Sequence, residues 1–205
     1  MAKIKRWIAN LKVAGKLKAY RLMVLVMTVF LVLVTLISTM VIRSNIREIT
    51  EVWSPAVEYI QELETMTSNY RVKQYQHLVE TDPAVLTACE AEIENIAGQI
   101  TETGKELDAI MNSDKEAQAG KADYDEANSA WNAYKEASEE ILQLSSNGEQ
   151  AEAAELMTGS VYESYKNFGE KINILRNDFQ VKLDESKSIA NWCTAVSYTH
   201  LRAHE

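Results

Sequence analysis

The first pattern along the chain is an uninterrupted apolar run, Leu22–Ile42, which reads LMVLVMTVFLVLVTLISTMVI. It contains no charged residue, no Gly and no Pro, and about 20 apolar residues are enough for a helix to cross a bilayer. Its polar residues are Ser and Thr, whose hydroxyls can bond to the backbone of their own helix. A core helix of this length would show a polar stripe, which is missing here. The run therefore predicts a transmembrane helix.

The residues before this run predict its direction. Residues 1–21 carry seven Lys or Arg and no Asp or Glu. Positive residues close to the first span stay in the cytoplasm, so we expect a cytoplasmic N-terminus and a bundle outside the cytoplasm, anchored in the inner (cytoplasmic) membrane. A cleaved signal peptide would have a shorter apolar region and a small-x-small site, so an uncleaved anchor is favoured. The basic arm is suited to anionic membrane lipid, with an amphipathic helix at the interface.

After the span, the apolar positions follow a heptad pattern. From Trp53 to His77 their spacing alternates between three and four residues, which is typical of a helix packed along a coiled-coil seam. Ser54-Pro55 is the one expected interruption. The second half of this seam is unusually polar. The predicted seam positions are Trp53, Ala56, Ile60, Leu63, Thr67, Tyr70, Gln74 and His77.

Two further helices show the same spacing. Asp82-Pro83 predicts an N-cap and a first-turn proline, and Ser113–Glu116 matches a capping box at the start of the next helix. Ser146-Asn147-Gly148 predicts the turn that ends it. The second helix has predicted seam positions Leu86, Cys89, Ile93, Ile96, Ile100, Thr103, Leu107 and Ile110. The third has Ala117, Gly120, Tyr124, Ala127, Trp131, Tyr134, Ser138, Ile141 and Ser145.

The fourth helix breaks the pattern. Around Met157–Phe168 an extra four-residue step interrupts the heptad, and Thr158-Gly159 lies there. We expect helices at about 43–80, 83–112, 114–146 and 149–193, the last with a break near 158–160. The sequence therefore predicts an all-α fold, a membrane-anchored up-down-up-down four-helix bundle over 43–193 whose first helix is continuous with the transmembrane helix.

Composition narrows the function. Outside the basic arm the chain is strongly acidic, with 14 basic and 30 acidic residues, which argues against a nucleic-acid partner. Cys89 and Cys193 fall on apolar positions and are interpreted as buried free thiols, in preference to a disulfide. There is no CxxC, CxxCH or Cys–His cluster, and a di-iron site would need a second histidine besides His77. We therefore expect no cofactor, no metal, no catalytic residue and no enzymatic activity.

The end of the chain departs from these patterns. The last ten residues, Val196–Glu205, look like one reading frame of a transposase-based sequencing adapter. We interpret them as an artefact tail, so that His200 and His204 carry no functional meaning. The alternative is a genuine polar tail.

Architecture and local sequence together resemble one family. The segment Asn69-Tyr-Arg-Val-Lys-Gln-Tyr-Gln-His-Leu, the following Asp-Pro helix start and Asn147-Gly-Glu-Gln-Ala-Glu-Ala-Ala-Glu-Leu are similar to methyl-accepting chemotaxis proteins. Residues 1 to about 193 resemble the N-terminal part of such a receptor, with a four-helix-bundle sensor domain. The resemblance implies further parts that this sequence lacks: a second span, a HAMP linker and a cytoplasmic signalling hairpin. That hairpin carries the methylated glutamates and docks a coupling protein and a histidine kinase.

A candidate ligand site lies near the expected membrane-distal end of the bundle. Arg71 presents a planar fork of donors suited to a carboxylate, and polar and aromatic residues of the first and fourth helices are expected beside it. The predicted ligand-binding residues are Asn69, Arg71, Lys73, Tyr75, Tyr162 and Tyr165. The ligand would be a small anionic or amphoteric molecule, or a ligand-loaded binding protein. Alternatively, Arg71 pairs with a neighbouring Glu and the tyrosines are core.

Charged residues flank the predicted seam, and this arrangement fits a homodimer of two copies of the chain. The predicted function is the extracytoplasmic ligand-sensing and transmembrane signalling part of a chemotaxis receptor. Two alternatives stay open: the sensor domain of a membrane histidine kinase or nucleotide cyclase, and a structural membrane-anchored coiled coil that senses nothing.

Overall fold

The computed structural model describes residues 13–202, and the side-chain surroundings of residues 15–195. Every element assigned in this range is helical, which confirms the all-α class. The elements are α2 Val13–Glu48, the π-helix η1 Ile49–Trp53, α3 Ser54–Val79, α4 Pro83–Ser113, the 3-10 helix η2 Ala117–Gly120, α5 Lys121–Ser146, α6 Gln150–Thr158 and α7 Ser160–Arg202. Most of the predicted amphipathic interface helix lies outside the described residues.

The chain divides into two compact units, residues 1–46 with 188–205, and residues 47–187. The first unit contains the apolar part of α2, where none of the most apolar 18-residue window is buried. Thr28, Thr35 and Thr39 donate to carbonyls four residues earlier, at 2.9, 2.9 and 2.8 Å, as expected for hydroxyls in lipid. This exposed apolar helix suggests that the protein is anchored in a membrane.

The helix accommodates Pro55 by a local widening of one turn. Proline lacks an N–H and its ring clashes with the carbonyl four residues earlier. The structure avoids the clash with the π-helical turn η1, in which the Ser54 N–H donates to the Ile49 carbonyl, five residues back. The predicted interruption is therefore local, and the helical run continues from α2 through η1 into α3. Trp53, at the end of η1, is buried against the edge of Phe179, with ring centroids 5.6 Å apart.

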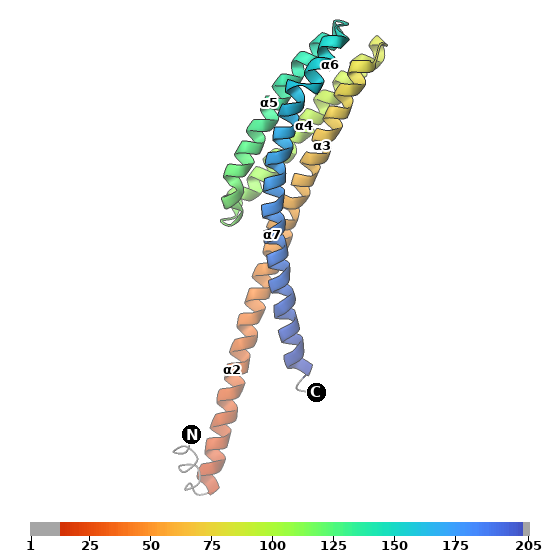
Figure 1. Ribbon diagram of the computed structural model, residues 1–205. Coiled ribbons are helices and arrows are strands. Elements are labelled where there is room, and N and C mark those ends of the chain that lie inside the picture. Colours follow the sequence, from red (N-terminus) through yellow and green to blue (C-terminus); the bar gives the residue numbers. More distant parts are fainter. Residues whose placement is uncertain (1–12, 203–205) are drawn as a thin grey trace. The chain divides into compact units, whose positions relative to one another are not determined.

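The second unit is a four-helix bundle in which α3, α4, α5 and the α6–α7 pair run alternately in opposite directions (Figure 1). All eight predicted seam positions of α3 are buried, and so are those of α5 from Tyr124 to Ser145. The bundle therefore closes over a single apolar and aromatic core, the burial of which drives folding.

Four predicted seam positions of α4, namely Leu86, Ile96, Thr103 and Ile110, are only partly buried, although Ile96 and Ile110 still pack against the core. Beside the last three of these positions, the buried residue lies one position later, at Ala97, Gly104 and Met111. The reason is a close contact with α5, because the Tyr124 hydroxyl donates to the Gly104 carbonyl at 2.6 Å. A Cβ at position 104 would lie 3.1 Å from that hydroxyl. At this turn the heptad pattern favoured Thr103 and overlooked the neighbouring glycine that permits the close contact.

The capping box predicted at Ser113–Glu116 is also wrong. Helix α4 includes Ser113, whose hydroxyl donates back to the Ile110 carbonyl at 2.9 Å. Asp114 has the extended backbone of an N-cap (φ −124°, ψ 135°) and accepts the Glu116 and Ala117 N–H groups at 2.8 and 3.1 Å. The third helix therefore starts with η2 and becomes α-helical only at Lys121.

The fourth helix is divided at Gly159, within the range expected for the break. The Gly159 N–H donates to the carbonyls of Glu155 and Leu156, at 2.9 and 3.2 Å, which ends α6. A Cβ at this position would lie 2.9 Å from the Glu155 carbonyl oxygen, so only glycine fits without a shift. Helix α7 continues to Arg202, beyond the expected end at 193. Cys89 and Cys193 are both free and buried, as predicted.

Candidate ligand-binding site

The candidate site centres on Arg71, which extends from α3 into the bundle and is 8% exposed. Its Nη2 donates to the Met157 carbonyl and to the Tyr75 hydroxyl, both at 3.0 Å. Met157 lies in the last turn of α6, two residues before the break at Gly159. The sequence placed Arg71 beside the seam, but the structure places it inside, where it joins α3 to the break in the fourth helix.

Three tyrosine rings surround the guanidinium group. Its Cζ lies 5.1 Å from the ring centroid of Tyr75, 5.1 Å from that of Tyr162 and 4.8 Å from that of Tyr165. Attraction between a cation and aromatic faces partly offsets the loss of water around a buried arginine. We call Arg71 and these three tyrosines the cage. Four of the six predicted site residues thus come together.

No carboxylate neutralises the cage. None of the ion pairs between described residues includes Arg71, and its Nη1 is buried without a hydrogen-bond partner. Burial raises the pKa of Tyr70 to about 12 and also raises the pKa of Tyr134, so both phenols stay neutral. The alternative in which Arg71 pairs with a neighbouring Glu is therefore wrong. A buried cation without a counter-ion is the central electrostatic feature of this site.

Two more polar groups of α3, Thr67 Oγ1 and Gln74 Nε2, are also buried without a hydrogen-bond partner. Thr67, Arg71 and Gln74 follow one another at spacings of four and three residues, so they lie along one face of α3. The other amide atom of Gln74 is satisfied, because its Oε1 accepts from the Tyr134 hydroxyl at 2.8 Å. A buried donor without a partner costs about 1–3 kcal/mol, so this face of α3 is a polar stretch that a further hydrogen-bond partner would stabilise. The phenols of Tyr134 and Tyr70 lie near Arg71 and Gln74.

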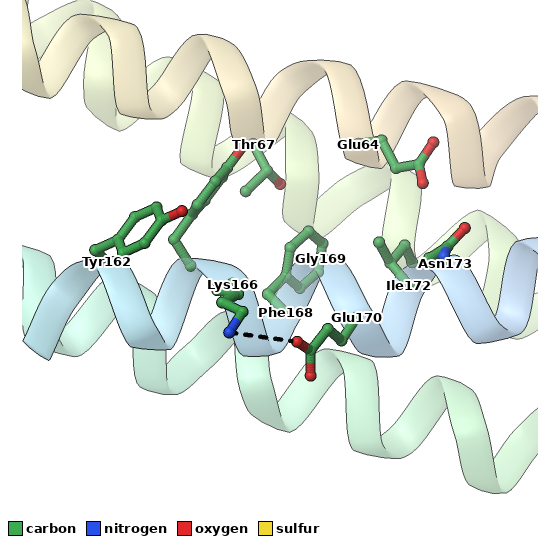
Figure 2. A pocket seen from close by; sticks show the side chains of 10 residues that line it. Glu64, Thr67, Tyr162, Lys166, Phe168, Gly169, Glu170, Ile172 and Asn173 are labelled. Carbon is green, nitrogen blue, oxygen red and sulfur yellow. Dashed lines mark ion pairs between the residues drawn. The ribbon is translucent and has the colours of Figure 1, made fainter.

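A groove of about 390 Å³ opens beside the cage, between α3 and α7 (Figure 2). Thr67, Tyr162 and Tyr165 line it. Figure 2 shows Glu64 and Thr67 on one helix facing residues of α7 on the other. The volume is typical of a site for a small molecule. The full set of lining residues is Glu64, Thr67, Tyr162, Tyr165, Lys166, Phe168, Gly169, Glu170, Ile172 and Asn173.

The groove combines an apolar floor with paired charges. Phe168 and Ile172 are 3% and 2% exposed, so they provide an apolar floor. Its charged groups already have partners: Lys166 lies 3.9 Å from Glu170, and Arg176 lies 3.4 Å from Glu64. Of the three α3 groups without a hydrogen-bond partner, the Thr67 hydroxyl lines the groove, whereas Arg71 and Gln74 are not among its lining residues.

The other two predicted residues lie elsewhere. Lys73 forms an ion pair with Glu92 of α4, which raises the pKa of the Lys73 ammonium, and Asn69 is exposed. Residues two positions from Arg71 point away from it, since each helical residue turns the chain by about 100°. The polar second half of the α3 seam was the sequence signal for Thr67 and Gln74. Nothing in the sequence indicated the contact between Arg71 and the Met157 carbonyl.

The helical bundle and its exposed apolar helix define a class of protein, a four-helix bundle with a candidate membrane span. A family model described as a four helix bundle sensory module for signal transduction matches residues 10–190. The chain therefore belongs to this family, the four-helix-bundle sensory modules of methyl-accepting chemotaxis proteins, as the sequence resemblance indicated. Among curated proteins, none matches the sequence.

Proposed function

We propose that this chain is the ligand-sensing and transmembrane signalling part of a chemotaxis receptor, and that it binds a small organic anion or amphoteric molecule at Arg71. The observation that carries the proposal is the buried guanidinium, which has no counter-ion and an Nη1 without a hydrogen-bond partner. It lies against the rings of Tyr162 and Tyr165, and both of these residues line an open groove. A carboxylate at this position would supply a charge-assisted bond. The apolar floor formed by Phe168 and Ile172 would hold the rest of the ligand.

The signal would start at the break in the fourth helix. Arg71 holds the Met157 carbonyl, and a ligand carboxylate would compete with that carbonyl for the guanidinium. A ligand shifts a conformational equilibrium only by its difference in affinity between the two states. Here the two states would differ in the position of α7 against α3, with a shift of about 1–2 Å, as at other helix interfaces.

The remaining parts of the proposal follow the family. The bundle would lie outside the cytoplasm and the basic arm inside, in the cytoplasmic membrane, and the receptor would act as a homodimer. A second span, a HAMP linker and a signalling hairpin would carry the signal to a coupling protein and a histidine kinase. The three buried donors without partners favour sensing over a purely structural coiled coil, which gains nothing from them.

A thermal-shift experiment on the full chain in nanodiscs tests the ligand site. The panel contains mono- and dicarboxylates and amino acids, with the matching neutral amides as controls. A ligand at 100 times its Kd stabilises the folded state by about 2.7 kcal/mol, so binding is visible as a rise in Tm. We expect at least one carboxylate to raise Tm while its amide does not.

Two arginine variants locate the effect. Arg71→Met keeps much of the side-chain volume but removes the charge, and replacing an unpaired buried ion by an apolar group is often neutral or stabilising. We expect it to fold and to lose the carboxylate-dependent shift. Arg47→Met is the matched control, because the Arg47 side chain is 74% exposed and should leave the shift unchanged. A full shift in Arg71→Met would exclude this site, and silence of the wild type across the panel would exclude direct sensing of small anions.

A further inference from the structure

His77 is a completely buried histidine at the end of the bundle that holds the α3–α4 and α5–α6 turns, the upper end in Figure 1. Both of its ring nitrogens have partners. Nδ1 lies 3.0 Å from Ser145 Oγ on α5, and Nε2 lies 3.1 Å from Glu90 Oε1 on α4. One imidazole therefore links three helices. We call this end of the bundle the turn end.

The hydrogen positions follow from the partners. Ser145 has a single hydroxyl hydrogen, which it donates to the His77 carbonyl at 3.1 Å. Its oxygen therefore presents a lone pair to Nδ1, so Nδ1 has to carry a hydrogen. Glu90 Oε1 accepts a hydrogen bond from Ser146 at 3.0 Å, so it also faces Nε2 as an acceptor. All these bonds form together only when both ring nitrogens carry hydrogen, that is, when His77 is an imidazolium.

A neutral ring has one N–H and must give up one of these bonds. If the hydrogen stays on Nδ1, the lone pair of Nε2 faces the Glu90 carboxylate. If the hydrogen moves to Nε2, Ser145 has to turn its hydroxyl toward Nδ1, and the buried His77 carbonyl loses that donor. Either way, a connection between α3 and a neighbouring helix is weakened.

The surrounding charges leave Glu90 as the main partner of the imidazole. On α3, Lys73 is paired with Glu92, and the Glu80 carboxylate accepts backbone N–H groups of the α3–α4 turn. On α4, the Cys89 thiol donates to a backbone carbonyl and burial raises its pKa, so it stays neutral. Helix α5 contributes the hydroxyls of Ser145 and Ser146 and, farther along α3 beside Tyr70, the Glu139 carboxylate, and α6 contributes the neutral amide of Gln150.

We propose that His77 is a proton-sensing site, a function beyond ligand binding. In acidic medium the imidazolium clamps α3, α4 and α5 at the turn end, and in alkaline medium the ring loses its proton and the clamp loosens. Histidine is the side chain whose charge ordinarily changes between pH 5 and 8. Since His77 follows Arg71 by six residues on α3, about 9 Å along the helix, a change at the clamp reaches the ligand site through one rigid element. The module therefore responds to the pH of the medium as well as to its ligand.

The first test is nitrogen NMR of the full chain in nanodiscs, with 15N-labelled histidine, between pH 5 and 8.5. The His77 signals, assigned by their loss in His77→Gln, are expected to change from two protonated ring nitrogens to one. Hydrogen exchange gives a second measurement. After correction for intrinsic rates, protection of turn-end peptides should fall by roughly tenfold on going from pH 5.5 to 8, because bonds to a charged group are lost. Peptides from the middle of the bundle, around Ile60, should keep their protection.

A substitution of Glu90, the hydrogen-bond partner of His77, tests the proposal in a variant that is expected to fold. Glu90→Gln retains an oxygen acceptor but removes the charge, and its side chain is 46% exposed, so the variant should fold. Its protonation midpoint is expected at lower pH than in the wild type. Glu94→Gln, on an exposed face of the same helix, is the matched control and should leave the midpoint unchanged. A His77 signal that keeps one protonation state from pH 5 to 8.5, or an unchanged midpoint in Glu90→Gln, would overturn the proposal.

Discussion

At the residue scale, packing at the start of the third helix depends on the missing side chain of Gly120. A Cβ at this position would lie 2.5 Å from Phe179 Cε2 and 3.3 Å from Leu175 Cδ1. Phe179 is 3% exposed and packs against Trp53, so it has little room to move. The glycine therefore allows α7 to approach η2 closely.

Gly120→Ala should therefore destabilise the bundle. Overpacking a core costs about 1–3 kcal/mol, which exceeds the small helix-propensity gain of alanine in a short 3-10 turn, so we expect a net loss of about 1–2 kcal/mol. Gly98→Ala is the control, since nothing lies within 4 Å of a Cβ built there on the exposed face of α4, and it should stabilise by about 0.5–1 kcal/mol. Urea denaturation of both variants measures the difference. If both variants changed the free energy of unfolding equally, the Phe179 side chain would be able to move aside for the added methyl group.

The residue types in the sequence predicted the chemistry of the candidate site better than they predicted where its side chains point. The sequence identified Arg71, Tyr75, Tyr162 and Tyr165, because arginine and tyrosine near a break in the heptad suggest binding. It could not predict that Arg71 turns inward, since the acceptor is a backbone carbonyl, which any residue at position 157 would supply. Hydrogen-bond partners across helices depend on register and rotation, and no local pattern encodes them.

At the element scale, periodicity predicted the helices and the core face of α3 and α5, while caps and small-residue contacts escaped it. A Ser-x-x-Glu motif can start a helix, but so can the aspartate that follows the serine here. The alternating spacing in α4 was equally compatible with either of two neighbouring seams. The choice between them came from the contact between Gly104 and Tyr124, two residues on different helices.

The corrected cap gives a prediction at this scale. Asp114→Ala removes the acceptor for two backbone N–H groups at the start of the third helix and should lower the free energy of unfolding by about 1 kcal/mol. Ser113→Ala removes only an exposed bond to the Ile110 carbonyl, so we expect a change within about 0.5 kcal/mol. Denaturant titration of both variants measures the two changes in the free energy of unfolding. A larger loss in Ser113→Ala would restore the capping box expected from sequence.

At the scale of the whole molecule, charge is distributed unevenly along the chain. The 21 residues before the apolar run hold seven basic and no acidic residues, whereas the remainder has 14 basic and 30 acidic residues. Positive charges within about 15–20 residues of a span set its orientation, and acidic residues contribute little. The arm alone should therefore hold the N-terminus in the cytoplasm and leave the bundle outside.

This orientation predicts the outcome of a protease experiment on spheroplasts that express the full chain with an N-terminal tag. Added protease should digest the bundle and spare the tag. Replacing the seven basic residues of the arm by glutamine removes the asymmetry, so a fraction of molecules should insert in reverse and become resistant in the bundle. Replacing seven Lys or Arg of residues 71–187 is the control, because those side chains lie more than 15–20 residues from the span and should not affect insertion. Protection of the wild-type bundle would contradict the orientation, and with it an outward-facing site for ligand and protons.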